Sequence, residues 1–344
     1  MLQSLAVSQK EYLSKNQTTA LKGMLALCVL LCHVVPASGV FQGSILSPLF
    51  GSLGYLSVAV FFFLSGYGIA VQYQAKKEYY LKTFLKNRVA SIYCLTLFLT
   101  ILYGVFRILV GVRFSLFEIL QSLLIGNTIV SNGWYLQIVL LFYILWYLTT
   151  KHIKDEQARY AALCVAVLLY MLIGMLFLAH FWFQSSLGFL LGVFWQRNKQ
   201  RLDNWLFFSR KRVFAVLSIT FIAFCITYLL ASKGFIPHKA ISAIFRSVMS
   251  CLSAALFVVL VLMFNMLFGK VFNCNALQFV GKLSMEIYVL QGIPLHIFKT
   301  GKLSIGNGWL YIVCVIAVTV LLSIAMHPII QFVTNIPKKA QGGP

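Results

Sequence analysis

The amino-acid sequence predicts an all-α integral membrane protein, a bundle of about ten transmembrane helices with both termini in the cytoplasm. Of its 344 residues, 60% are hydrophobic and only 10% are charged, and the mean hydropathy is +0.89. A soluble fold of this length does not need so much apolar surface, whereas a multi-pass protein in a lipid bilayer does. The net charge of +21 would indicate nucleic-acid binding in a soluble protein. Here the cations lie in short loops between apolar runs, so no nucleic-acid partner is expected.

Apolar runs of about 17 to 25 residues are long enough to cross a bilayer, and they define the expected spans. The ten runs are 20–38, 52–73, 89–111, 134–150, 159–178, 180–196, 213–231, 245–268, 277–298 and 309–333. A shorter run at 114–125 is expected to be an interfacial or re-entrant helix, with Glu118 paired to Arg113 at the outer surface. Residues 1–334 are therefore expected to form a single transmembrane domain, followed by a short cytoplasmic tail at 335–344.

The loops between these runs predict the topology. With the N-terminus inside, the inner segments hold 21 of the 28 lysines and arginines, as the positive-inside rule requires. Seven of the eight cysteines lie inside apolar runs and none lies in an outer loop, so neither a disulfide framework nor a metal site is expected. The segments expected outside are 36–51, 112–133, 232–244 and 299–308.

The first apolar run carries two polar residues on one face. Lys22 and His33 are eleven positions apart, about three helical turns and about 16 Å along the axis. Because hydrocarbon is a poor environment for an imidazole, His33 is expected to face the protein interior or a wet cavity, in the outer part of the membrane. Two interpretations stay open, a functional residue or a histidine that hydrogen-bonds a neighbouring helix.

Five stretches of the chain carry recognisable motifs. In chain order they read KGMLALCVLLCHVV, GYLSVAVFFFLSGYGIAVQY, FLKNRVASIY, NGWYLQIVLLFYILWYL and VGKLSMEIYVLQ. Their order and spacing resemble those of the acyltransferase-3 family of membrane-bound acyltransferases, which modify surface polysaccharides and related acceptors. The chain departs from the family pattern at Lys22, where Arg is commoner, and at Gln291, where His is commoner. Arg88 is followed by Ser91 where the family usually has a second Arg.

The resemblance implies transfer of an acetyl group from cytoplasmic acetyl-CoA to a hydroxyl of a cell-surface polysaccharide or glycolipid, in a bacterial plasma membrane. No bound cofactor is expected, since acetyl-CoA is the donor substrate. His33 is the expected catalytic residue, either as the general base that takes the hydroxyl proton or as a covalent acyl carrier. The expected ligands of the donor phosphates are Lys22, Lys86 and Arg88.

Two further pairs of residues are candidates for binding the acceptor. Ser65 and Tyr67 adjoin Gly66, and small residues of this kind either let a ligand approach or let two helices pack closely. Trp134 and Tyr135 begin a span at the outer interface, where they either stack on a sugar or belong to an ordinary aromatic belt.

Near the end of the chain, Glu286 is expected to pair with Lys282, four residues earlier on the same helix. His327 is expected to lie at the membrane interface.

Two other functions remain open from the sequence. A transporter or exporter also suits ten spans with buried polar residues, but the paired broken helices of two repeated halves are not seen. Some stretches also resemble the membrane part of serine/alanine racemases, although the sequence shows no soluble racemase domain.

Overall fold

The computed structural model describes residues 12–124, 129–232, 238–272, 274–300 and 303–339, and all the regular secondary structure in these ranges is helical. The prediction of an all-α protein is therefore confirmed. The chain folds into two compact units, each assembled from separate segments. The first unit comprises Met1–Leu25, Tyr55–Lys77 and Asp155–Lys282, and the second comprises Ala26–Gly54, Glu78–Lys154 and Leu283–Pro344.

Two long helices belong partly to each unit. Helix α2 (Lys15–Ser38) passes from the first unit into the second after Leu25. Helix α3 (Leu46–Phe84) bends at Lys77, whose φ of 45° is a left-handed conformation that a side chain tolerates poorly. The chain re-enters the second unit at Glu78, directly after this bend.

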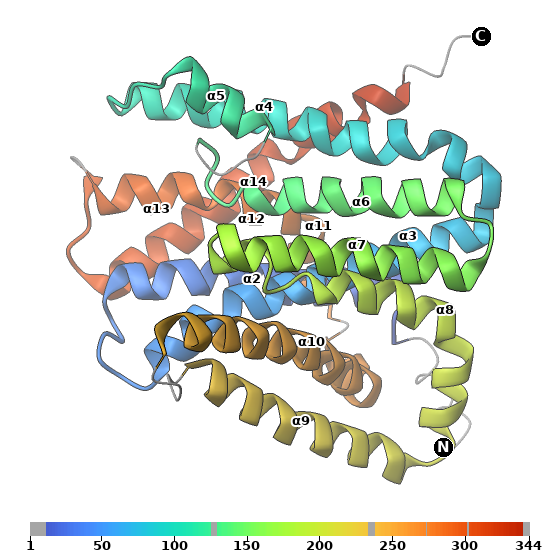
Figure 1. The fold of residues 1–344 in the computed structure, drawn as a ribbon. Helices are drawn as coiled ribbons and strands as arrows, with labels where there is room; N and C mark the ends of the chain where they lie inside the picture. The colour runs from blue at the N-terminus through green and yellow to red at the C-terminus, as the bar shows by residue number, and fades with distance from the viewer. Residues whose placement is uncertain (1–11, 125–128, 233–237, 273, 301–302, 340–344) are drawn as a thin grey trace. The chain divides into compact units, whose positions relative to one another are not determined.

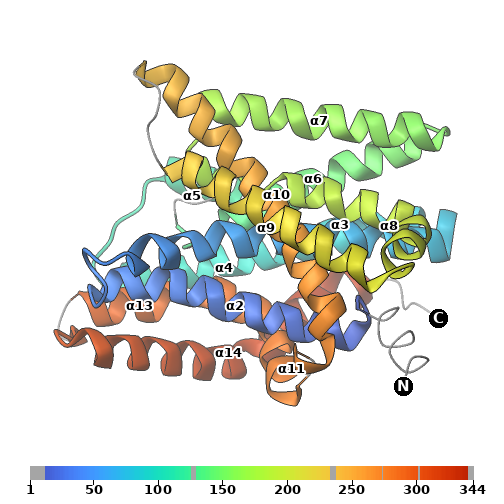
Figure 2. The ribbon, with the colours of Figure 1, turned by 90° about the horizontal axis from the view of Figure 1, so that it is seen from below.

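The first unit contains the hairpin of α9 and α10, which pack along each other, with α8 against both (Figures 1 and 2). Its helices beyond α2 and α3 are α7 (Glu156–Phe177), η2 (His180–Trp182), α8 (Leu187–Phe207), α9 (Arg210–Ser232), α10 (Lys239–Phe272) and α11 (Asn275–Lys282).

Glycines let the backbones of α3 and α8 touch inside the first unit. A Cβ atom at Gly188 would collide with the carbonyl oxygen of Ala59, and one at Gly192 would lie 2.7 Å from the Tyr67 nitrogen. A Cβ at Gly66 would collide with the carbonyl oxygen of Phe189. The packing interpretation of Gly66 is therefore correct, and the contact is of the small-residue type common between membrane helices.

The second unit is built around α14, which packs against α4, α12, α13 and η1, while α6 packs against α4 and η1. Its helices beyond α2 and α3 are η1 (Leu85–Ala90), α4 (Ser91–Leu109), α5 (Leu116–Leu124), α6 (Trp134–His152), α12 (Ser284–Leu290), α13 (Gly292–Lys299) and α14 (Gly308–Lys339).

Six helical stretches of the described chain are long and apolar enough to cross a membrane. One of them, Leu46–Leu109, has 64 residues and would extend about 96 Å, which is more than one crossing of a core about 30 Å thick. Large apolar side chains are also exposed along α7 and α9, for example Val165, Phe177 and Ile219. These faces need lipid around them. The chain is a multi-pass membrane protein, and the number of ten spans and the cytoplasmic termini stay predictions.

The expected ninth span, 277–298, is not one continuous helix. It is divided into α11, α12 and α13 at Leu283 and Gln291. The second break has a local cause, because Pro294 has no N–H to donate to the carbonyl of Leu290, the last residue of α12. The expected tail is partly helical, since α14 continues through Lys339.

The expected ion pair of Glu118 with Arg113 is replaced by a capping box at the start of α5. The amide and hydroxyl of Ser115 donate to Glu118 Oε2 at 2.7 and 2.9 Å, and the Glu118 amide donates to the Ser115 hydroxyl at 3.2 Å. These donors lower the pKa of the Glu118 carboxyl. The arrangement was readable from the sequence, because Ser115 and Glu118 have the spacing of this motif.

Candidate functional site

The residues predicted to form the site divide between the two units. The second unit contains His33, Lys86, Arg88, Trp134 and Tyr135. The first unit contains the other three, which are Lys22, Ser65 and Tyr67.

His33 lies on the part of α2 that belongs to the second unit, and its side chain is half-buried. In the described part of the chain the imidazole has no hydrogen-bond partner. Its neighbour Cys32 donates from Sγ to the carbonyl of Gly51 at 3.2 Å, which fixes this face of α2 against the start of α3. Because Pro36 has no N–H, it also leaves the Cys32 carbonyl without its usual intrahelical partner.

A hollow of about 170 Å³ lies at the end of α2, close to His33 in the sequence. It contains the side chains of Gln42 and Ser47, so it is not purely apolar. Pro36, which also lines it, is one helical turn beyond His33. The lining residues are Val35, Pro36, Gly39, Phe41, Gln42 and Ser47.

Buried aromatic side chains form a cluster in the same unit. The ring of Tyr135 on α6 lies 5.1 Å from that of Tyr288 on α12, and Trp134 meets Tyr135 edge-on at 6.4 Å. Trp134 and Tyr135 are 8% and 6% exposed, so they are interior residues and do not form an aromatic belt facing lipid. Cys32 lies within electrostatic range of the Tyr288 hydroxyl. Tyr288 was not predicted as a site residue, although it ends a stretch that resembles the family motif.

Tyr103 supports the break between α12 and α13. Its hydroxyl donates to the carbonyl of Val289 at 2.6 Å. A Cβ atom at Gly292 would lie 2.8 Å from the Tyr103 oxygen, and it would also collide with the side chain of Ser131. The broken helix therefore has a defined and tightly packed geometry.

Arg88 lies in η1, and its side chain is exposed. Its guanidinium adjoins the hydroxyls of Tyr80 and Tyr143, and Lys338 of α14 lies within electrostatic range of it. None of the ion pairs in the described ranges involves Arg88 or Lys338. The neighbouring Asn87 has a buried Oδ1 with no hydrogen-bond partner within the described ranges. Two cations without a carboxylate partner are a suitable site for an anion.

The expected pair of Glu286 with Lys282 is wrong. Helix α11 ends at Lys282 and α12 begins at Ser284, so the two residues do not share one helix. Glu286 instead accepts a hydrogen bond from His327 of α14, with 2.7 Å between Oε1 and Nδ1. His327 is therefore a half-buried residue that pairs with a buried carboxylate, and its expected place at the membrane interface stays a prediction. The sequence offered one signal, since a carboxylate in an apolar run needs a partner.

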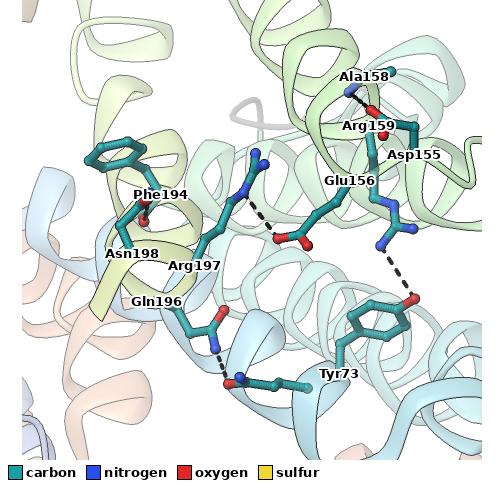
Figure 3. A network of polar contacts seen from close by, with 10 residues as sticks. Tyr73, Asp155, Glu156, Ala158, Arg159, Phe194, Gln196, Arg197 and Asn198 are labelled. Carbon is teal, nitrogen blue, oxygen red and sulfur yellow. Dashed lines mark hydrogen bonds and ion pairs between the residues drawn. The ribbon is translucent and has the colours of Figure 1, made fainter. Parts of the chain in front are cut away.

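In the first unit, Arg197 and Arg159 each contact a side chain of a neighbouring helix (Figure 3). Arg197 Nε lies 3.0 Å from Glu156 Oε1, and Arg159 donates to the Tyr73 hydroxyl at 3.3 Å. These contacts join α3, α7 and α8. Arg197, Glu156 and Arg159 therefore have a structural role in holding these helices together.

A second polar cluster of the first unit contains Tyr12. Its hydroxyl accepts a hydrogen bond from Trp195 at 2.7 Å and donates to Asp203 at 2.9 Å, and Lys199 pairs with the same carboxylate. Burial raises the pKa of the Tyr12 hydroxyl far above its usual range, so it stays protonated and able to donate. Tyr67 lies within electrostatic range of Asp203.

The first unit also has an apolar pocket of about 550 Å³ between α2, α9 and α10. Its lining is hydrocarbon except for Ser218 and Asn265, so it lacks the groups that acyl transfer requires.

A family model described as an acyltransferase domain, that of the acyltransferase-3 family, matches residues 17–327 of the 344. The chain belongs to the acyltransferase-3 family. It is a membrane acyltransferase, and the transporter alternative is not favoured. No curated protein and no solved structure matches the chain.

For an acyltransferase, the second unit contains the more suitable chemistry. An imidazole without a hydrogen-bond partner in the described chain can accept a proton or attack a thioester carbonyl. An exposed guanidinium in the same unit can hold phosphate. In this acyltransferase, Lys22, Ser65 and Tyr67 stay predictions, as do the roles of the five residues in the second unit.

Proposed function

We propose that this acyltransferase transfers an acetyl group from cytoplasmic acetyl-CoA to a hydroxyl of a cell-surface polysaccharide or glycolipid, in the plasma membrane of a bacterium. The observation that supports this most is His33, a half-buried imidazole without a hydrogen-bond partner in the described chain. It shares a compact unit with Arg88, which has no carboxylate partner among the residues that the structure describes. The first group is suited to acyl transfer and the second to the phosphates of the donor.

The reaction needs one proton to move. As the acceptor oxygen attacks the thioester carbonyl, His33 takes the hydroxyl proton, the C–S bond breaks, and the proton passes to the departing thiolate. In the alternative route the His33 nitrogen attacks first and releases coenzyme A, and the acceptor hydroxyl then takes the acetyl group from the imidazole. The hollow lined by Gln42 and Ser47 offers polar groups for an acceptor one turn beyond His33.

The test is His33→Ala, with His152→Ala as the matched control because His152 is an exposed histidine at the end of α6. Acetylation of surface glycans is measured by compositional analysis in cells that express each variant at equal level. His33→Ala is expected to lower the rate by about 10² to 10⁴, and His152→Ala is expected to leave it unchanged. Normal acetylation by a correctly inserted His33→Ala protein would disprove the assignment.

The two routes are separated without knowing the acceptor. If His33 carries the acyl group, the purified protein exchanges labelled coenzyme A into acetyl-CoA when no acceptor is present. A general base alone does not support this exchange.

A further inference from the structure

One oxygen of the Glu286–His327 pair has no hydrogen-bond partner. The Glu286 side chain is 4% exposed, and its Oε1 is held by His327 at 2.7 Å. The other ring nitrogen of His327 lies 2.8 Å from the amide nitrogen of Gln331. Glu286 Oε2 lacks any partner in the part of the chain that the structure describes. A buried carboxylate oxygen without a hydrogen bond is unfavourable, so this arrangement is incomplete and suits an additional N–H or O–H donor.

One member of each group lies on α14, His327 of the pair and Lys338 of the two cations. Lys338, which lies within electrostatic range of Arg88, is eleven residues after His327 on α14. This corresponds to about 16 Å along the helix. The Glu286–His327 pair and the two cations all belong to the second unit. The distance between the pair and the cations is therefore set by the length of α14 between His327 and Lys338.

Coenzyme A has the chemistry that matches this spacing. Its phosphates form one end, and its pantetheine arm carries two secondary amides, each with one N–H. The arm is about as long as four extended residues, roughly 14 Å. With the phosphates at Arg88 and Lys338, the arm extends along α14 to the depth of Glu286. An amide N–H that donates to a carboxylate forms a strong, charge-assisted hydrogen bond.

We propose that Glu286 binds the pantetheine arm by accepting a hydrogen bond at Oε2 from one of its amides. This inference rests on the proposed function, in which acetyl-CoA is the donor. His327 is a positioning residue, because its bond to Oε1 fixes the carboxylate so that Oε2 faces the arm. The competing explanation is that the pair only fastens α12 to α14.

The experiment compares two probes on the full-length protein in lipid nanodiscs by calorimetry. Coenzyme A contains the arm, and adenosine 3′,5′-bisphosphate does not. Glu286→Ala is expected to weaken coenzyme A binding by about 10-fold or more while leaving the bisphosphate unchanged. Glu286→Gln keeps an acceptor oxygen and is expected to recover part of the loss. Glu118→Ala removes an exposed carboxylate of the same unit and is expected to change neither.

The outcomes are distinct. Unchanged coenzyme A binding by Glu286→Ala, or an equal loss for both probes, would overturn the inference. If neither probe binds the unaltered protein, the proposed donor itself is wrong. If Arg88→Ala weakens both probes but Glu286→Ala weakens neither, the donor proposal stands and the role of Glu286 is rejected.

A second measurement does not depend on the folding of a variant. The unaltered protein is titrated with coenzyme A analogues in which either arm amide is replaced by an ester, which removes the N–H. One of the two analogues is expected to bind about 10-fold more weakly. Equal affinity of both analogues and coenzyme A would contradict the proposal.

Discussion

The two units use their positive charge differently. In the first unit, Arg197 pairs with Glu156 and Lys199 pairs with Asp203, and Lys199 also lies 4.8 Å from the ring centre of Tyr12. These cations satisfy carboxylates of their own unit. The pair of Arg197 connects α8 to α7, whereas the pair of Lys199 lies within α8.

In the second unit, Arg88 and Lys338 lie near each other, and the neighbours of the guanidinium are the hydroxyls of Tyr80 and Tyr143. Two like charges repel unless an anion lies between them. We therefore expect a cation that obeys the positive-inside rule to bind a ligand where, as at Arg88, the described part of the chain provides no carboxylate partner.

The largest effect on stability is expected from a substitution that disrupts the packing of α3 against α8 in the first unit. Gly192→Ala places a methyl group against the backbone of α3 and is expected to lower the free energy of unfolding by about 1 to 3 kcal/mol. Gly68→Ala is the control, because a Cβ atom there meets nothing within 4 Å. Unfolding in detergent, followed by circular dichroism, compares the two. Similar losses for both variants would show that the glycine contacts do not hold α3 to α8.

The next effect tests the comparison of charges directly. Arg88→Ala is expected to raise the apparent KM for acetyl-CoA by about 10-fold or more, and Arg88→Lys is expected to recover only part, since lysine lacks the planar fork. Arg197→Ala removes one charge from the first unit and is expected to leave this KM unchanged. Steady-state kinetics on equal amounts of inserted protein provide the measurement. Equal changes for Arg88→Ala and Arg197→Ala would remove the distinction between the units.

The smallest effect concerns Glu118, an exposed carboxylate of the second unit. Because the pKa of Glu118 is lowered in the folded protein, the stability that its carboxylate gives to α5 is fully present above the pKa of an unfolded glutamate. That contribution is lost as the pH falls through the lowered, folded-state pKa. Hydrogen exchange of the first-turn amides of α5 is therefore expected to be faster, relative to the rest of the chain, at acid pH. Glu118→Gln should remove this pH dependence, and an unaltered profile would contradict the role of the capping box.

Much of the fold was predictable because each apolar run specifies its own helix. His33 could be placed on a helix from its run alone, and α7 begins and ends within three residues of the expected span 159–178. The expected span 180–196 agrees less well, because α8 begins only at Leu187 and extends to Phe207. Local chemistry was sufficient for these features.

The rest depends on contacts between distant segments. Glu286 and His327 are 41 positions apart, and Arg88 adjoins Lys338 only because α14 packs against η1. Pro294 could have indicated the break at Gln291, but the apolar run around it led to the expectation of one continuous span. The division into two units could not be predicted from the sequence, since both units consist of apolar helices.

The interleaving of the units determines when each can be completed during synthesis. The first unit requires the chain as far as Lys282, and the second requires the segment that begins at Leu283. Helices α2 and α3 must therefore remain in the bilayer while most of their partners are still being translated. Their backbones tolerate this delay, because an α-helix satisfies its own hydrogen bonds in lipid. A chain that stops at Lys154 contains neither unit in full, and one that stops at Lys282 completes the first unit but leaves the second without α12, α13 and α14.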